Sequence, residues 1–153
     1  MGLGDVYARL ERWSQAREYY EKALTLDPFD IEAHERMGDL AIMRQDANRA
    51  AAAYANLVLL APERIDFRHK WARALVAASQ PEQAVTVYED ILEMKPDDME
   101  SLVRLGLLHV ALGRRDPVAR ERHRERARRY LEQAHELNPE NQAVQDMLSK
   151  LED

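Results

Sequence analysis

Histidine is the residue type in this chain best suited to bind a metal or to act as a general base, so its spacing is the first question. The five histidines are His34, His69, His109, His123 and His135. None forms a His-Glu-x-x-His pattern, because His34-Glu35 and His135-Glu136 lack a second histidine four residues after the first. The sequence has no cysteine, no glycine-rich phosphate loop and no Gly-x-Ser-x-Gly. We therefore expect no catalytic residue, no metal site and no cofactor, and a chain that is not an enzyme.

A run of arginines is the second chemical feature. Residues 114–129 hold eight arginines against Asp116, Glu121 and Glu125, a net charge of +5 in a chain of net charge −6. On a helix they would form two rows, the first with Arg120, Arg124 and Arg128 and the second with Arg122, Arg126 and Arg129. Such a stripe suits an anionic surface, although Tyr130 is the one ring nearby for base stacking. The alternative is an exposed helix whose arginines pair with Glu121, Glu125 and Glu132.

The elements that carry these residues come from an internal repeat. Residues 16–28 return as residues 50–62 and 84–96, each with alanine first, tyrosine four residues later and proline last. The prolines, Pro28, Pro62 and Pro96, are 34 residues apart, whereas the fourth, Pro139, follows after 43. A fixed period of this size indicates a repeated helical unit. The fourth copy (Ala127, Leu131, Ala134, Pro139) therefore carries an insertion of nine residues.

A small residue stands ten positions after each of the first three prolines, at Gly38, Ala72 and Gly106, and Gly4 occupies the same place in the first copy. A hydrophobic residue precedes it each time. This pattern resembles the tetratricopeptide repeat, whose helical pairs carry Leu-Gly in the first helix and Ala, an aromatic residue, Ala and Pro in the second. The resemblance covers nearly all 153 residues. Two departures from the family pattern are Trp71-Ala72 in place of Leu-Gly and Leu131 in place of the aromatic residue. Both change the size of a side chain in the expected core.

The resemblance implies an all-α, right-handed helical-repeat solenoid of about four helix pairs and a C-terminal capping helix. We expect one domain with repeats at about 1–28, 29–62, 63–96 and 97–139, an insertion near 114–126, and a capping helix over 140–153. The insertion most simply lengthens the second helix of the fourth pair, over 117–137. Ser14, either Asp97 or Asp98, and Asp116 are the expected helix caps. Residues 1–4 would enter the first helix part-way, which predicts a truncated N-terminus.

The resemblance also implies that the first helices of successive pairs line a concave groove that binds a partner. Its acidic half would hold Asp5, Glu32, Glu35 and Asp39, and its basic half Lys70, Arg73 and Arg104. An apolar strip would run along one side. The complete set of expected groove residues is Glu32, Glu35, Arg36, Asp39, Ile42, Met43, His69, Lys70, Arg73, Val76, Arg104 and Leu107.

We predict a non-enzymatic scaffold or adaptor that binds a peptide or a helix of a protein partner, one with an acidic segment, in this groove. One alternative is an anion-binding adaptor that uses residues 114–129 on nucleic acid or a membrane surface; another is a regulatory arm of a larger enzyme. The negative net charge disfavours nucleic acid. No apolar run approaches the length of about 18 residues that a membrane span needs. We expect the cytoplasm, with the periplasm left open, and self-association through an uncovered N-terminal end.

Overall fold

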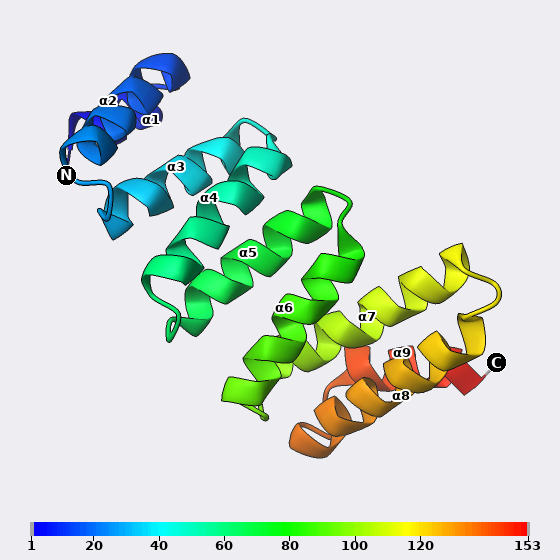
Figure 1. The fold of residues 1–153 in the computed structure, drawn as a ribbon. Helices are drawn as coiled ribbons and strands as arrows, with labels where there is room; N and C mark the ends of the chain where they lie inside the picture. The colour runs from blue at the N-terminus through cyan, green and yellow to red at the C-terminus, as the bar shows by residue number, and fades with distance from the viewer. Residues whose placement is uncertain (1, 153) are drawn as a thin grey trace. The chain divides into compact units, whose positions relative to one another are not determined.

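The computed structural model describes residues 2–152, apart from the side chain of Glu152, and this part of the chain is helical without a strand. Its helices are α1 (Leu3–Arg9), α2 (Trp13–Leu26), α3 (Ile31–Met43), α4 (Ala47–Leu60), α5 (Ile65–Ala77), α6 (Pro81–Met94), α7 (Met99–Arg115), α8 (Arg120–Leu137) and α9 (Gln142–Glu152) (Figure 1). The prediction of an all-α fold of helix pairs with a final helix is confirmed. The chain divides into two compact units, Met1–Gln80 with α1 to α5 and Pro81–Asp153 with α6 to α9.

In the first unit, each helix packs on the next one along the chain. Gly4 on α1 and Gly38 on α3 determine how closely the two helices of each pair approach one another. A Cβ added at Gly4 would lie 2.5 Å from Cε1 of Tyr20, and one added at Gly38 would lie 2.4 Å from Cε1 of Tyr54. Both distances are far below a normal contact, so each tyrosine ring rests directly on the backbone of its partner helix.

The fourth repeat, in the second unit, has leucine where the other repeats have tyrosine. A Cβ added at Gly106 on α7 would lie 2.6 Å from Cγ of Leu131 on α8, so the pair is as close as those of the first unit. Leu131 belongs to a buried cluster that α9 completes with Val144 and Leu151. The final helix therefore covers the end of this core, as expected for a capping helix.

The turns inside the helix pairs repeat along with the helices. Glu11, Gln45 and Ser79 have positive φ angles of 56°, 57° and 59° and are 34 residues apart. A left-handed residue after a helix satisfies its last carbonyls and turns the chain, and glycine usually serves there. Because none of the three is glycine, the sequence carried no signal for this turn.

Helix starts follow the cap predictions in part. Asp98 accepts a hydrogen bond from the backbone N–H of Ser101 at 2.9 Å, which confirms that cap, and Asp30 does the same for Ala33 at 3.0 Å. The prediction for Ser14 was wrong: α2 begins at Trp13, and its N-cap residue Arg12 makes no side-chain cap. The turn at Glu11 sets this start, two residues earlier than a Ser14 cap requires.

The nine inserted residues are divided between two helices. Helix α7 has 17 residues where α3 and α5 have 13, and α8 has 18 where α4 and α6 have 14. The connection 116–119 is one residue longer than its counterparts 44–46 and 78–80. The prediction that α8 alone is lengthened was therefore wrong. A turn added to one helix of an antiparallel pair would have no partner to pack on, whereas here Gly113 and His123 meet across the added turns.

Candidate functional site

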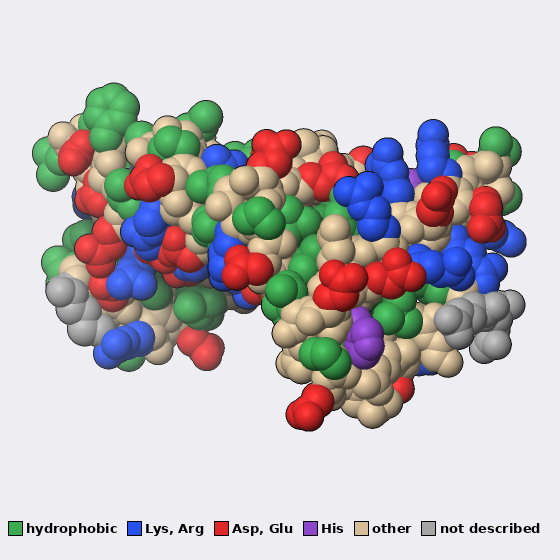
Figure 2. Space-filling model, turned by 90° about the horizontal axis from the view of Figure 1, so that it is seen from below, with side chains coloured by type: hydrophobic (Ala, Val, Ile, Leu, Met, Phe, Trp, Pro, Cys, Tyr) green, Lys and Arg blue, Asp and Glu red, His purple; other side chains and the backbone are tan. Residues whose placement is uncertain are grey.

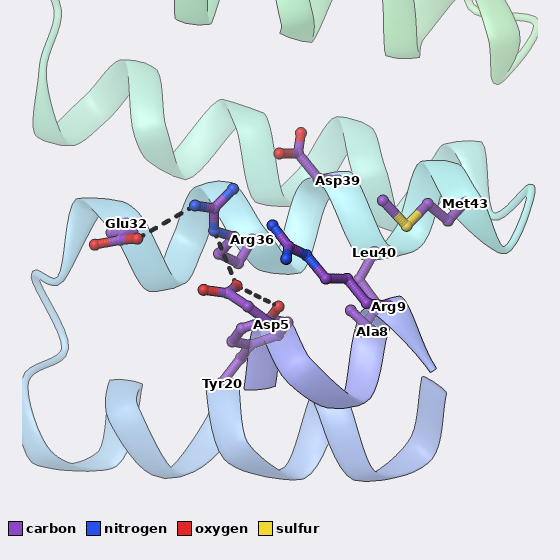
Figure 3. A pocket seen from close by; sticks show the side chains of 9 residues that line it. All are labelled: Asp5, Ala8, Arg9, Tyr20, Glu32, Arg36, Asp39, Leu40 and Met43. Atoms are coloured by element: carbon purple, nitrogen blue, oxygen red, sulfur yellow. Dashed lines mark hydrogen bonds and ion pairs between the residues drawn. The ribbon is translucent and has the colours of Figure 1, made fainter. Parts of the chain in front are cut away.

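A pocket of about 390 Å³ opens between α1 and α3 in the first unit (Figure 3). Four predicted groove residues line it: Glu32, Arg36, Asp39 and Met43. Asp5, which the sequence also placed in the groove, lies at its charged end. Ala8, Leu40 and Met43 form an apolar side, and the Arg9 side chain starts beside Ala8 on α1 and points toward Arg36 and Asp39.

Two consecutive repeats contain the same polar chain. The Tyr20 hydroxyl donates to Oδ1 of Asp5 at 2.9 Å, and Nε of Arg36 lies 3.1 Å from the same oxygen. One repeat later, the Tyr54 hydroxyl donates to Oδ1 of Asp39 at 2.7 Å, and Nζ of Lys70 lies 3.0 Å from it. Each chain joins the two helices of a pair to the first helix of the next pair. The third copy has Arg73 in place of the aspartate, so the pattern stops there.

Further ion pairs neutralise the groove of the first unit. Glu32 pairs with Arg36 at 3.3 Å, and Glu35 pairs with Lys70 at 2.5 Å. The sequence predicted Glu35 and Asp39 in the acidic half of the groove and Lys70 in the basic half. The structure corrects that view, because Lys70 reaches back to both carboxylates. Residues on neighbouring first helices are 31 to 35 positions apart in sequence, yet they lie within reach of a lysine side chain.

The ionisation states strengthen this network. Burial, followed by the hydrogen bond to Asp5, raises the pKa of Tyr20 to about 12, and burial and Asp39 likewise raise the pKa of Tyr54. Burial on its own would lower the pKa of Lys70, but the bonds to Glu35 and Asp39 outweigh it and raise the pKa overall. Both hydroxyls therefore remain donors and Lys70 remains charged at neutral pH.

Three of the predicted groove residues are exposed apolar side chains, of which Met43 lines the pocket. Met43, Ile42 and Val76 are 58%, 45% and 43% exposed. Arg9 is exposed and has no ion pair or hydrogen bond with any other described residue. Arg73 donates from Nε to the carbonyl of His69 at 3.2 Å. His69 itself is buried, so the prediction that its side chain faces a partner was wrong.

The remaining predicted groove residues belong to the second unit. Leu107 on α7 is 40% exposed, and Arg104 is half exposed with its Nε 4.0 Å from Oε1 of Glu100.

The arginine-rich helix α8 is only partly free. Nε of Arg124 donates to the carbonyl of Leu151 at 2.6 Å, its Nη2 donates to the same oxygen, and Nη2 of Arg128 lies 3.4 Å away. These two arginines thus stabilise the C-terminal end of α9, where the helix dipole favours a cation. Arg129 lies over the ring of Tyr130 at 5.9 Å. Within the described chain, none of the eight arginines forms an ion pair with Glu121, Glu125 or Glu132.

Two histidines meet where α7 and α8 are extended. Nδ1 of His109 lies 3.0 Å from Nδ1 of His123, and Tyr130 stacks on His109 with ring centroids 5.8 Å apart. Burial, helped by the nearby His123 and Arg126, lowers the pKa of His109 to about 4. No group of three histidine, cysteine, aspartate or glutamate residues in the described part of the chain is placed to hold a metal.

The sequence predicted Tyr20 and Tyr54 as packing residues of the second helices, and their hydrogen bonds to Asp5 and Asp39 were not predicted. The Gly-Asp dipeptides at residues 4–5 and 38–39, each followed by a tyrosine 15 residues after the aspartate, are the signal that could have found these bonds. Arg9, expected to face the groove from the first helix, does line the pocket.

Similar proteins agree with this architecture. Models of the tetratricopeptide repeat match residues 1–30 and 69–116. A curated relative, protein O-mannosyl-transferase Tmtc2 of Drosophila melanogaster, is 33% identical over 79 residues, which are 51% of this chain and 8% of that protein. The chain therefore matches less than a tenth of that relative's length.

Solved structures share the fold at low sequence identity. The crystal structure of MamA superposes with a TM-score of 0.79 at 16% identity, covering 99% of this chain and 83% of that one. The Arabidopsis OM64 TPR domain gives 0.64 at 17%, covering 79% and 93%, and a thermophilic TPR protein of Thermus thermophilus gives 0.59 at 24%, covering 97% and 77%.

No helix in the described residues is both long and apolar enough to cross a membrane. The repeat models, the nine described helices and the shared fold together give the identity: this chain belongs to the tetratricopeptide repeat family, whose helical repeats typically serve as non-catalytic protein-interaction scaffolds.

Proposed function

We propose that the first unit, Met1–Gln80, binds an extended or helical segment of a protein partner over the groove formed by α1, α3 and α5, and that the chain acts as a scaffold or adaptor. The carrying observation is the pocket of Figure 3, where the exposed side chain of Met43 lies beside a polar network whose charges pair with one another. Such a surface supports a partner that supplies apolar side chains.

The apolar contribution comes from Met43, Ile42 and Val76. Each is about half exposed, so each has apolar surface left to bury. At about 25 cal/mol per Å² of buried apolar surface, complete burial of the three would contribute a few kcal/mol. Met43 is unbranched and flexible, which allows it to adapt to different partner side chains.

The charge preference of the partner follows from the internal pairing. The sequence-based hypothesis placed an acidic part of the partner over Lys70, Arg73 and Arg104. Because Lys70 is held by Glu35 and Asp39, we now assign the acidic residue of the partner to Arg9 instead. Arg9 stands at the edge of the apolar side of the pocket, so the proposed ligand has an acidic residue next to a large apolar one.

A random peptide display library selected on the purified chain tests this proposal. Peptides that bind should be enriched in an acidic residue adjacent to large apolar residues. Titration of a selected peptide by fluorescence anisotropy should show at least about tenfold weaker binding to Arg9→Glu and to Met43→Glu. The matched control is Leu59→Glu on α4, since Leu59 is 80% exposed and does not line the pocket. Equal binding to Met43→Glu and Leu59→Glu would place the site elsewhere.

Catalysis is not part of the proposal for this chain. The relative named above is an O-mannosyl-transferase, but the match is confined to 79 residues of a much longer protein. We propose that the repeats contribute binding, either as an independent adaptor or as an arm of a larger enzyme. Even in the second case, the groove of the first unit would hold a protein segment rather than perform the reaction.

A further inference from the structure

The tip of the α7–α8 hairpin, residues 114–122, extends beyond the standard repeat. It consists of the turn added to α7, the connection 116–119 and the first residues of α8. Arg114, Arg115, Arg120 and Arg122 are all exposed there. Figure 2 shows blue Lys and Arg side chains gathered over the part of the surface that α8 and the end of α7 form, with red acidic side chains among them.

Several arginines outside the tip have an acidic partner close to them in the sequence. Arg17 pairs with Glu21, and Arg64 pairs with Asp66, each on its own helix or turn. At the tip, no arginine has an ion pair or hydrogen bond with another described residue. Asp116 does not neutralise them directly, because its Oδ1 accepts from the backbone N–H groups of Val118 at 2.9 Å and Ala119 at 3.1 Å.

The same turn presents an apolar side chain. Val118 is 96% exposed, and Pro117 beside it is exposed as well. The two hydrogen bonds to Asp116 hold the backbone of this turn, and Ala119 is buried behind it. Val118 is therefore held in an exposed position in the connection between α7 and α8, with arginines on both sides of it along the chain.

We propose that this tip docks on an anionic lipid bilayer, with the arginines on phosphate groups and Val118 in the headgroup region. A turn between two helices is convex, so it offers no track for a peptide, whereas a bilayer can deform around it. The ring of Tyr130 is stacked on His109, and its hydroxyl bonds Glu89, so it is not available to stack on a nucleic-acid base. A second copy of the chain is disfavoured, because its groove carboxylates Asp5 and Asp39 already pair with Arg36 and Lys70.

The charge distribution favours an oriented approach. Residues 114–129 carry +5 and the whole chain −6, so the remainder carries −11 and is repelled by an anionic surface. Each arginine close to such a surface strengthens binding about fivefold at moderate salt. The contribution is electrostatic and therefore decreases as salt is added.

Co-sedimentation of the full chain with vesicles tests the proposal. The parent should bind vesicles of mixed phosphatidylcholine and phosphatidylglycerol, in a salt-dependent manner, and should not bind phosphatidylcholine alone. Arg115→Gln with Arg122→Gln should weaken binding about 30-fold, and Val118→Ser should weaken it several-fold without a change of charge. The control pair Arg12→Gln with Arg44→Gln makes the same change in net charge at exposed positions of the first unit and should bind like the parent. Circular dichroism checks that all variants are folded.

Several outcomes would overturn the assignment. If the parent binds vesicles of phosphatidylcholine alone as tightly as the mixed vesicles, the tip is not the docking surface. The same holds if the tip pair and the control pair lose binding equally. Tighter binding to a DNA duplex or to polyglutamate than to the mixed vesicles, abolished by the tip pair, would assign the arginines to nucleic acid or to an acidic protein instead. Unchanged binding of the tip pair to the vesicles would also refute the proposal.

Discussion

His109 should make the second unit less stable as the pH falls. The ring is 1% exposed, its Nε2 has no hydrogen-bond partner among the described residues, and its Nδ1 faces Nδ1 of His123. The other groups that face it are Arg126, whose charge opposes a proton, and the stacked Tyr130, both on α8. Folding therefore favours the neutral ring.

The size of the effect follows from the two pKa values. Above about pH 6.5 the ring is neutral in the folded and the unfolded chain, so the free energy of unfolding does not depend on its titration. Below that pH the unfolded chain binds a proton that the folded chain, with a pKa of about 4, does not. The stability lost should reach about 2 kcal/mol at pH 5 and about 3 kcal/mol below pH 4.

Urea unfolding of the parent and His109→Gln at pH 7.5, 6 and 5 measures this loss. Glutamine does not titrate, so the difference between the two proteins isolates His109 from the carboxylates. Both tryptophans, Trp13 and Trp71, lie in the first unit. Tryptophan fluorescence therefore follows that unit, while circular dichroism follows both. If the parent and His109→Gln lose stability equally between pH 7.5 and 5, His109 is not the source of the pH dependence.

Two further predictions concern packing and capping. Gly38→Leu and Gly106→Leu should each destabilise the chain by about 1–3 kcal/mol in urea unfolding, whereas Gly2→Leu, with nothing within 4 Å of the added Cβ, should not; a neutral result at both buried glycines would contradict the packing described. Arg124→Ala should lower the local stability of α9 by about 1–2 kcal/mol, because the Leu151 carbonyl loses its cationic donor. Amide hydrogen exchange in α9 should then be faster in Arg124→Ala than in the parent. If the exposed control Arg122→Ala speeds exchange in α9 as much as Arg124→Ala does, the Arg124 cap is not the cause.

The architecture could be predicted because it depends on spacing. Alanine, tyrosine and proline recurring every 34 residues specify helices, their pairing face and their ends, and these positions agree with the helices observed. Even the close contacts were visible in the sequence as glycines, since only a missing side chain permits the approach of Tyr54 to Gly38.

The electrostatics of the groove could not be predicted in the same way. A sequence shows that Asp39 and Lys70 are charged, but not that residues 31 positions apart meet across neighbouring helices. The groove therefore looked divided into opposite charges when it is largely neutralised. Arg124 is a similar case: its partner is a backbone carbonyl on α9, and backbone groups are identical at every position of the sequence.

The equal division of the insertion has a consequence for how such a repeat can change length. Four residues added to each helix are close to one whole turn of about 3.6 residues, so the faces that pack below the added turns keep nearly the same direction. Residues at the tip can therefore vary in number by matched turns while the glycine, alanine and leucine contacts at the base of the hairpin stay as they are. The length of the hairpin can therefore change without a change in the packing of the repeat that supports it.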